Sequence, residues 1–291
     1  MKKKLIKIFN LILCVFAFCS CFNYQTKDIN DMNFIELNQY NKYLQDENAI
    51  LKDLKEELKE ISDGKTYNDI VGIINYVNDE IVKSNVMITS QAKSLFQSTS
   101  ISSGSGTIIK EDDLYYYVLT NNHVIYSFGY NVYYYVYDYL NNEYSNAQVL
   151  FSDPNYDMAL VRFKKGNDKL KVTKLASADI RIKENVIIIG QPQGQRNTVT
   201  LGEVISYGKV ECSDCQKDES NVKYDCVYYN AITTNGNSGG MILDYDYNLV
   251  GIVTFGMNAS NGEYLYGAGS PVSKIKEFFS GNNFEVGDNN D

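Results

Sequence analysis

The stretch Asn235-Gly236-Asn237-Ser238-Gly239-Gly240 lies between two runs of residues that have the composition of β-strands. A serine flanked by glycines between two strands lies where the backbone can come very close to a ligand. Gly236 can take backbone angles that are closed to other residues, and the two glycines after the serine put no side chain in the way. Such a loop can direct the N–H groups of Gly236 and Ser238, with Asn237 as a third candidate donor, to one point in front of the hydroxyl, as an oxyanion hole requires. Ser238 is therefore a candidate nucleophile.

A serine hydroxyl needs a base, and the base needs an orienting group. The chain contains one histidine, His123, within the sequence LTNNHVI at 119–125. The sequence DPNYDMALVRF at 153–163 supplies Asp157 between the histidine and the serine. The order His, Asp, Ser is one of several unrelated chain orders that build the same triad geometry. His123, Asp157 and Ser238 are therefore candidate catalytic residues.

These two sequences and TNGNSGG at 234–240 resemble the three catalytic blocks of HtrA-type (trypsin-like, bacterial) serine proteases. Residues 190–194 and 200–206 resemble a further block of that family, and the resemblance covers roughly residues 86 to 278. It implies a mainly β, chymotrypsin-like fold of two six-stranded barrels with the site in the cleft. In that family a Gly-Ser-Gly sequence, here 104–106, opens the strand before the histidine block. Too few residues follow the closing helix for the C-terminal PDZ domain that such enzymes commonly carry, and we expect a form without one.

Each candidate also has a plain structural interpretation. His123 could be a hydrogen-bonded histidine at a strand end, Asp157 a turn residue and Ser238 one polar residue in a tight loop. Each of these is plausible for a single residue. Their joint occurrence beside a loop suited to an oxyanion hole favours the catalytic interpretation.

Residues 1–20 have the features of an export signal, with four lysines in the first seven positions and a short apolar run at 11–18. The run is too short for a comfortable membrane span. A small residue precedes Cys21, as in bacterial lipoprotein signals, so we expect Cys21 to be the lipid-modified first residue of a protein anchored at the outer face of a bacterial membrane. An ordinary cleaved signal and an uncleaved anchor are the alternatives. Residues 21–33 are polar and would form a tether.

Residues 34–83 are expected to be helical. Apolar residues spaced by three and four give a heptad-like seam that ends at Gly64, namely Leu37, Tyr40, Leu44, Leu51, Leu54, Leu58 and Ile61. This pattern fits a coiled coil that joins protomers or lifts the enzyme off the membrane, and equally a single amphipathic helix. A second amphipathic helix follows over 70–81.

Residues 84–280 read as short strands separated by turn signals, with a closing helix at 272–279, and residues 281–291 as an acidic disordered tail. Removing the four lysines of the signal leaves 23 basic against 36 acidic residues, a formal charge of −13. That balance argues against nucleic acid as a partner, and polypeptide substrates are expected instead.

The cysteines after the signal are Cys212, Cys215 and Cys226. A zinc site would need four ligands, and the only histidine is assigned to the triad, so neither a metal nor another cofactor is expected. In an exported protein a disulfide between Cys226 and either Cys212 or Cys215 is the favoured interpretation, and free thiols are the alternative.

In chymotrypsin-like folds the residue six positions before the serine lies at the floor of the specificity pocket. Here that residue is Ile232, with Thr233 beside it. The facing wall would come from Val253, Phe255 and Gly267. The floor position holds no acidic residue, which argues against cleavage after Arg or Lys. The chain has no second histidine to bind a substrate carboxylate, which argues against cleavage after Glu. The prediction is a serine endopeptidase that cuts after small or medium apolar residues. The rival interpretations are a catalytically silent surface lipoprotein that binds or adheres, and an assembly protein acting through its heptad helix.

Overall fold

The computed structural model describes residues 67–93, 98–126, 132–210, 220–258 and 264–286. The expected signal, Cys21, the tether and the heptad segment lie outside the described residues. Within the described ranges, no helix is both long enough and apolar enough to cross a membrane.

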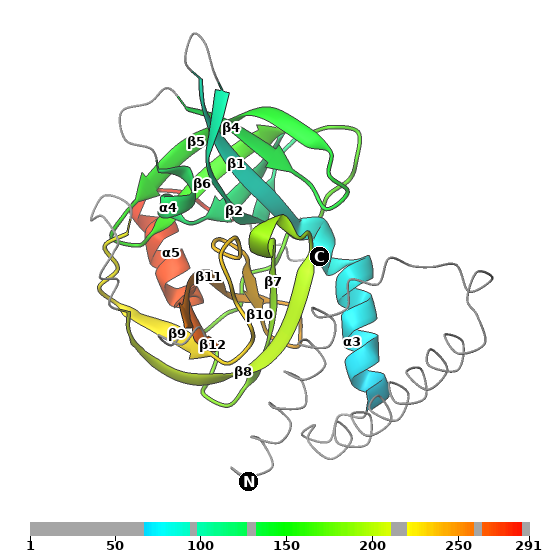
Figure 1. Cartoon of the computed structure of the whole chain (residues 1–291), viewed down its shortest axis with the longest axis vertical. Helices are drawn as coiled ribbons and strands as arrows, with labels where there is room; N and C mark the ends of the chain where they lie inside the picture. Colours follow the sequence, from blue (N-terminus) through cyan, green and yellow to red (C-terminus); the bar gives the residue numbers. More distant parts are fainter. Residues whose placement is uncertain (1–66, 94–97, 127–131, 211–219, 259–263, 287–291) are drawn as a thin grey trace, which may run out of the picture. The chain divides into compact units, whose positions relative to one another are not determined.

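The first six strands that the structure describes close into one antiparallel barrel (Figure 1). Their order around the barrel is β1-β2-β3-β6-β5-β4. Neighbours in this order are antiparallel, with β2 for example pairing Thr107 opposite Leu119 of β3. The strands are β1 (Asn85–Lys93), β2 (Ser98–Glu111), β3 (Tyr115–Thr120), β4 (Val132–Tyr137), β5 (Glu143–Asp153) and β6 (Met158–Lys164).

The next six strands close into a second antiparallel barrel, in the order β10-β11-β12-β9-β8-β7. They are β7 (Asn185–Gly190), β8 (Thr198–Lys209), β9 (Asp225–Tyr229), β10 (Met241–Leu243), β11 (Leu249–Asn258) and β12 (Tyr264–Pro271). The prediction of a mainly β fold with two six-stranded barrels is confirmed.

The core has three parts, one inside each barrel and one between the barrels. Side chains of a strand alternate between its two faces. In β7, Val186 and Ile188 therefore point into the second barrel, whereas Ile187 and Ile189 belong to the shared core. Because both faces are buried, β7 reads as a continuous apolar run, and each of its isoleucines contributes roughly 1.5–3 kcal/mol by burial. The shared core holds the two barrels against each other.

The helices are few and short. They are α3 (Tyr67–Asp79), η2 (Ile81–Ser84), α4 (Asn122–Ile125), η3 (Pro192–Gly194) and α5 (Val272–Gly281). The helices expected at 70–81 and 272–279 correspond to α3 and α5. The carboxyl-terminal helix α5 buries Ile275, Phe278 and Phe279 in the shared core.

A buried aspartate shapes the hairpin of β4 and β5. The strand ends at Tyr137 because the buried Asp138 turns the chain. The Asp138 carboxylate accepts the backbone N–H groups of Leu140 and Asn142, each at 2.9 Å. An aspartate that binds the backbone two residues on is a recognised turn former.

Candidate active site

His123 and Asp157 form a two-point contact. His123 lies in the short helix α4, which follows β3, and Asp157 lies in the turn between β5 and β6. The Asp157 carboxylate approaches the His123 ring nitrogen Nδ1 to 2.7 Å with Oδ2, and Oδ1 accepts the His123 backbone N–H at 3.0 Å. The Asp157 side chain has no exposed surface, whereas 29% of the His123 side chain is exposed. The carboxylate is thus enclosed behind a histidine whose ring reaches the surface.

The turn that carries Asp157 is held from two sides. Asp157 has a left-handed backbone conformation (φ 49°), which aspartate adopts more readily than most residues. The buried Asn121 amide donates to the Asp157 carbonyl at 2.8 Å. Asn221 donates its backbone N–H to the Pro154 carbonyl at 2.7 Å. Asn221, which lies between β8 and β9, therefore supports the same turn.

Ser238 comes from the second barrel, in the loop between β9 and β10, and β2 of the first barrel holds its backbone. The backbone N–H of Ser105 donates to the Ser238 carbonyl at 2.7 Å. At the neighbouring Gly104, an added Cβ would lie 2.6 Å from the Val124 side chain and 3.1 Å from the Ser238 carbonyl oxygen. The residue after His123 and the backbone of Ser238 thus both lie against Gly104. The structure joins His123 to Asp157 directly and places the Ser238 backbone beside the residue that follows His123.

The backbone of the serine loop is fixed by its carbonyl groups. The Asn235 carbonyl accepts the Gln193 N–H at 2.8 Å, and the Asn237 carbonyl accepts the Gly240 N–H at 2.8 Å. In a trans peptide the C=O and N–H groups point in opposite directions. The N–H groups of Gly236 and Ser238 are therefore directed away from these anchors, and within the described residues neither donates a hydrogen bond. Two unengaged N–H groups two residues apart are what an oxyanion hole needs.

Two glycines of this loop are required by the geometry. Gly236 has φ 98° and Gly239 has φ 83°, both in the left-handed range. A Cβ at Gly239 would lie 2.2 Å from the Ser105 carbonyl oxygen. A side chain at this position would separate the loop from β2.

The expectation that Asn237 adds a third oxyanion donor is wrong. Its backbone N–H already donates to the Thr234 carbonyl at 3.1 Å. Its side chain is buried, and an added Cβ at Gly190 would lie 2.3 Å from the Asn237 Oδ1 atom. Asn237 packs the loop against β7 and does not face a substrate.

The expected pocket residues divide into two groups. Ile232 is 47% exposed and so does not form a floor, whereas the neighbouring Thr233 is buried. Successive residues of an extended segment face opposite sides, which turns Thr233 inward and Ile232 outward. Val253 belongs to the core of the second barrel and is also excluded as a pocket wall. Thr233, Phe255 and Gly267 remain candidates.

Cys226 is a free thiol in β9 with no exposed surface. The structure thus differs from the expected disulfide at this residue, and Cys212 and Cys215 lie outside the described residues. Burial raises the pKa of the Cys226 thiol to about 12, and the charge of Asp157 adds to the effect. A thiol of this kind stays protonated at neutral pH and is a poor nucleophile.

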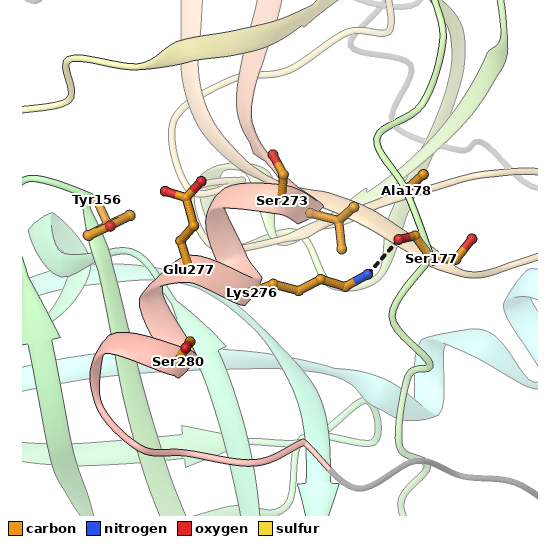
Figure 2. A pocket seen from close by; sticks show the side chains of 8 residues that line it. Tyr156, Ser177, Ala178, Ser273, Lys276, Glu277 and Ser280 are labelled. Atoms are coloured by element: carbon orange, nitrogen blue, oxygen red, sulfur yellow. Dashed lines mark hydrogen bonds between the residues drawn. The ribbon is translucent and has the colours of Figure 1, made fainter.

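A groove of about 600 Å³ runs beside α5 and is lined on one side by Tyr156 (Figure 2). Lys276 lies along it and donates to the carbonyls of Ala176 at 2.7 Å and Ser177 at 2.8 Å, so its charge is engaged in holding α5. None of the triad residues lines this groove. Among the described residues, no group of three or more His, Cys, Asp or Glu side chains is placed to hold a metal ion.

The sequence of this chain matches a known protein family. The model of the trypsin-like peptidase domain family matches residues 104–252, slightly more than half of the chain. The chain belongs to the trypsin-like peptidase family. The matched range contains all three triad residues, whereas β1 and α5 lie outside it.

Relatives of this trypsin-like peptidase are HtrA-type serine proteases of bacteria and animals. The chain is 29% identical over 213 residues to "Serine protease Do-like HtrA" of Bacillus subtilis, covering 71% of this chain and 44% of the relative. It is 32% identical to "Serine protease HTRA1" of Xenopus tropicalis, covering 61% of this chain and 35% of the relative. It is 28% identical to "Serine protease PepD" of Mycobacterium tuberculosis, covering 60% and 39% respectively. The chain thus spans less than half the length of these relatives.

Several residues that shape this peptidase site were not singled out from the sequence. Asn121 supports Asp157, Gln193 anchors the peptide before Gly236, and Tyr229 lies behind Thr233. The position of Asn121 within LTNNHVI was the one available signal. The other contacts join residues far apart in the chain.

Proposed function

We propose that this protein is a serine endopeptidase that works through an acyl-enzyme. His123 accepts the Ser238 proton as the hydroxyl attacks the peptide carbonyl, and then donates it to the leaving amine. Asp157 holds the imidazole in the required tautomer and stabilises the imidazolium. The N–H groups of Gly236 and Ser238 stabilise the tetrahedral oxyanion, and water repeats the sequence on the acyl-enzyme.

The observation that carries this proposal is the contact between His123 and Asp157. Both oxygens of a fully buried carboxylate bind one histidine. Val124, the next residue, and the Ser238 carbonyl both lie against Gly104. A protein that only binds or adheres has no need for such a contact. Hydrolysis of a mixture of unstructured peptides, with the cut sites read by mass spectrometry, tests the proposal. No cleavage by the purified protein would favour the silent binding alternative.

We further propose that the residue before the cut is small or medium-sized and apolar. The space between the two expected pocket walls is narrow, because a Cβ at Gly256 would lie 2.9 Å from the Thr233 carbonyl oxygen. Behind Thr233 the pocket is closed by Tyr229, whose hydroxyl accepts from Thr233 Oγ1 at 3.1 Å. The Tyr229 ring is fully buried and occupies the space where a Cβ of Gly267 would lie, 2.4 Å from it. A large or charged side chain would have to displace this ring.

Replacing Tyr229 with valine is expected to enlarge the pocket. The ratio of kcat/KM for a peptide with Phe before the cut to that for its Ala counterpart should rise at least roughly tenfold, since pocket contacts of this size are worth about 1–3 kcal/mol. The measurement is steady-state hydrolysis of matched fluorogenic peptides. Tyr228→Val is the matched control, because the Tyr228 hydroxyl donates to the Lys209 carbonyl and its ring lies against Tyr266. An unchanged ratio in Tyr229→Val, or a wild-type profile dominated by Arg, Lys or Glu, would refute this assignment.

We also propose that the protein is exported and anchored by a lipid on Cys21, and that residues 34–62 join protomers. The basic and apolar segment before Cys21 and the heptad-like pattern support this. Cys21→Ser is expected to move the protein from the detergent phase to the aqueous phase on phase separation. Sedimentation of that soluble variant with and without residues 34–62 then reports whether these residues join protomers or form a single amphipathic helix. Equal partitioning of the wild type and Cys21→Ser would contradict a lipid anchor on Cys21.

A further inference from the structure

Ser105 is the middle residue of the Gly-Ser-Gly sequence in β2, and its hydroxyl connects the first barrel to two segments of the second. The hydroxyl donates to the Gly236 carbonyl at 2.7 Å and accepts the Gln191 backbone N–H at 2.9 Å. The residue has no exposed surface. The mechanism proposed above uses none of these contacts.

The hydrogen bond from Ser105 to Gly236 holds the middle peptide of the serine loop. The Gly236 carbonyl belongs to the peptide that lies between the two peptides whose N–H groups form the oxyanion hole. Its neighbours, the Asn235 and Asn237 carbonyls, are held by the backbone N–H groups of Gln193 and Gly240. Of three successive carbonyls, the middle one is thus held by a side chain.

Glycine makes this anchor necessary. Gly236 adopts φ 98°, and glycine occupies several backbone conformations at similar cost, so its own geometry does not fix the orientation of the adjoining peptides. A rotation of either peptide would turn an N–H group away from the oxyanion position. A hydroxyl that is buried and bonded on both sides opposes this rotation.

We propose that Ser105 is a positioning residue for the oxyanion hole. It acts through the Gly236 peptide and also ties that peptide to the segment containing Gln191 and Gln193. This inference rests on the proposed protease function and extends it to a residue of the other barrel that does not touch the substrate.

The backbone contacts of Ser105 make the hydroxyl separable from the fold. The Ser105 N–H donates to the Ser238 carbonyl, and the Ser105 carbonyl accepts from Thr120 Oγ1 at 2.7 Å. Neither contact involves the side chain of Ser105. Removing the hydroxyl therefore leaves β2 attached to the serine loop while it releases the Gly236 carbonyl.

Ser105→Ala is expected to lower kcat for a peptide substrate by roughly ten- to hundredfold, less than the loss of a direct oxyanion donor, while KM changes by less than about threefold. The rate of labelling by a fluorophosphonate, whose phosphoryl oxygen enters the oxyanion hole, should fall by a similar factor. Ser105→Cys, with a weak S–H donor of similar size, should lie between the wild type and Ser105→Ala. Ser103→Ala, at an exposed position of the same strand, is the matched control and should match the wild type.

The outcomes separate this inference from the proposed function. Wild-type protein that neither cleaves peptides nor reacts with the probe overturns the protease function itself. Active wild type with a Ser105→Ala variant of equal kcat and labelling rate overturns only the role of Ser105. A rise in KM at constant kcat, or a loss that disappears when the assay is run well below the melting temperature of the variant, overturns it as well.

Discussion

Replacing Ser238 with alanine is expected to abolish peptide hydrolysis, with a loss in kcat of roughly a millionfold. The hydroxyl is the only group removed, and no acyl-enzyme can form without it. The fold should be kept, because the contacts that hold this residue use its backbone, such as the Ser238 carbonyl that accepts the Ser105 N–H. Steady-state hydrolysis and the thermal melting temperature are the two measurements.

The matched control for this change is Ser206→Ala, at a partly exposed position of β8 in the same barrel. It should retain wild-type activity. Hydrolysis by Ser238→Ala within a few-fold of the wild type, by protein free of contaminating protease, would reject Ser238 as the nucleophile.

Replacing Asp157 with asparagine is expected to lower kcat by roughly ten-thousandfold at neutral pH. The side chain keeps its shape, but an amide that donates to His123 Nδ1 places the imidazole proton on Nε2. His123 can then no longer accept the Ser238 proton. The change also replaces the 2.7 Å contact between a carboxylate and the ring with one between neutral groups. Activity should be assayed together with the melting temperature, because Asp157 is fully buried.

Asp153→Asn is the matched control for Asp157→Asn. Asp153 begins the same turn, but its carboxylate accepts the backbone N–H and the side-chain amide of Asn155, at 2.8 and 2.9 Å. We expect its activity to stay near that of the wild type. Equal losses in the two variants would mean that the turn as a whole, and not the charge of Asp157, supports activity.

The two barrels and the contact between His123 and Asp157 could be predicted because their signals are local. The chain offers a single histidine, and His123, Asp157 and Ser238 each lie in a short block whose residue types fit their chemistry. Short strands separated by turn signals indicate a β fold without any long-range information. The apolar run of β7 likewise signals a strand that is buried on both faces.

The errors concern the orientation of backbone and side chains within those blocks. The spacing from Ser238 places Ile232 near the pocket, but it does not say to which side of the chain the Ile232 side chain points. In the structure Thr233 is the residue that is turned inward, and Ile232 is exposed. The sequence likewise does not say which N–H groups of the loop are already engaged, and the turn contact to Thr234 removes Asn237 as a donor. Both outcomes depend on the local backbone conformation.

The contacts that could not be predicted join distant parts of the chain. Ser105 and Gly236 are 131 positions apart, and they meet only because β2 of one barrel faces the serine loop of the other. Tyr229 reads as one more strand residue until its pairing with Gly267 shows where its ring lies. Such contacts follow from the pairing of strands and the docking of barrels, which no local pattern encodes.

The most direct test of the proposed mechanism is labelling of the purified protein with a fluorophosphonate, alongside Ser238→Ala, with the modified residue identified by mass spectrometry. This probe reacts rapidly with a serine only when its base and oxyanion hole are assembled. We predict labelling at Ser238 that is lost in Ser238→Ala and strongly slowed in Asp157→Asn. Folded wild-type protein that remains unlabelled, or labelling that persists in Ser238→Ala, would contradict a triad of His123, Asp157 and Ser238.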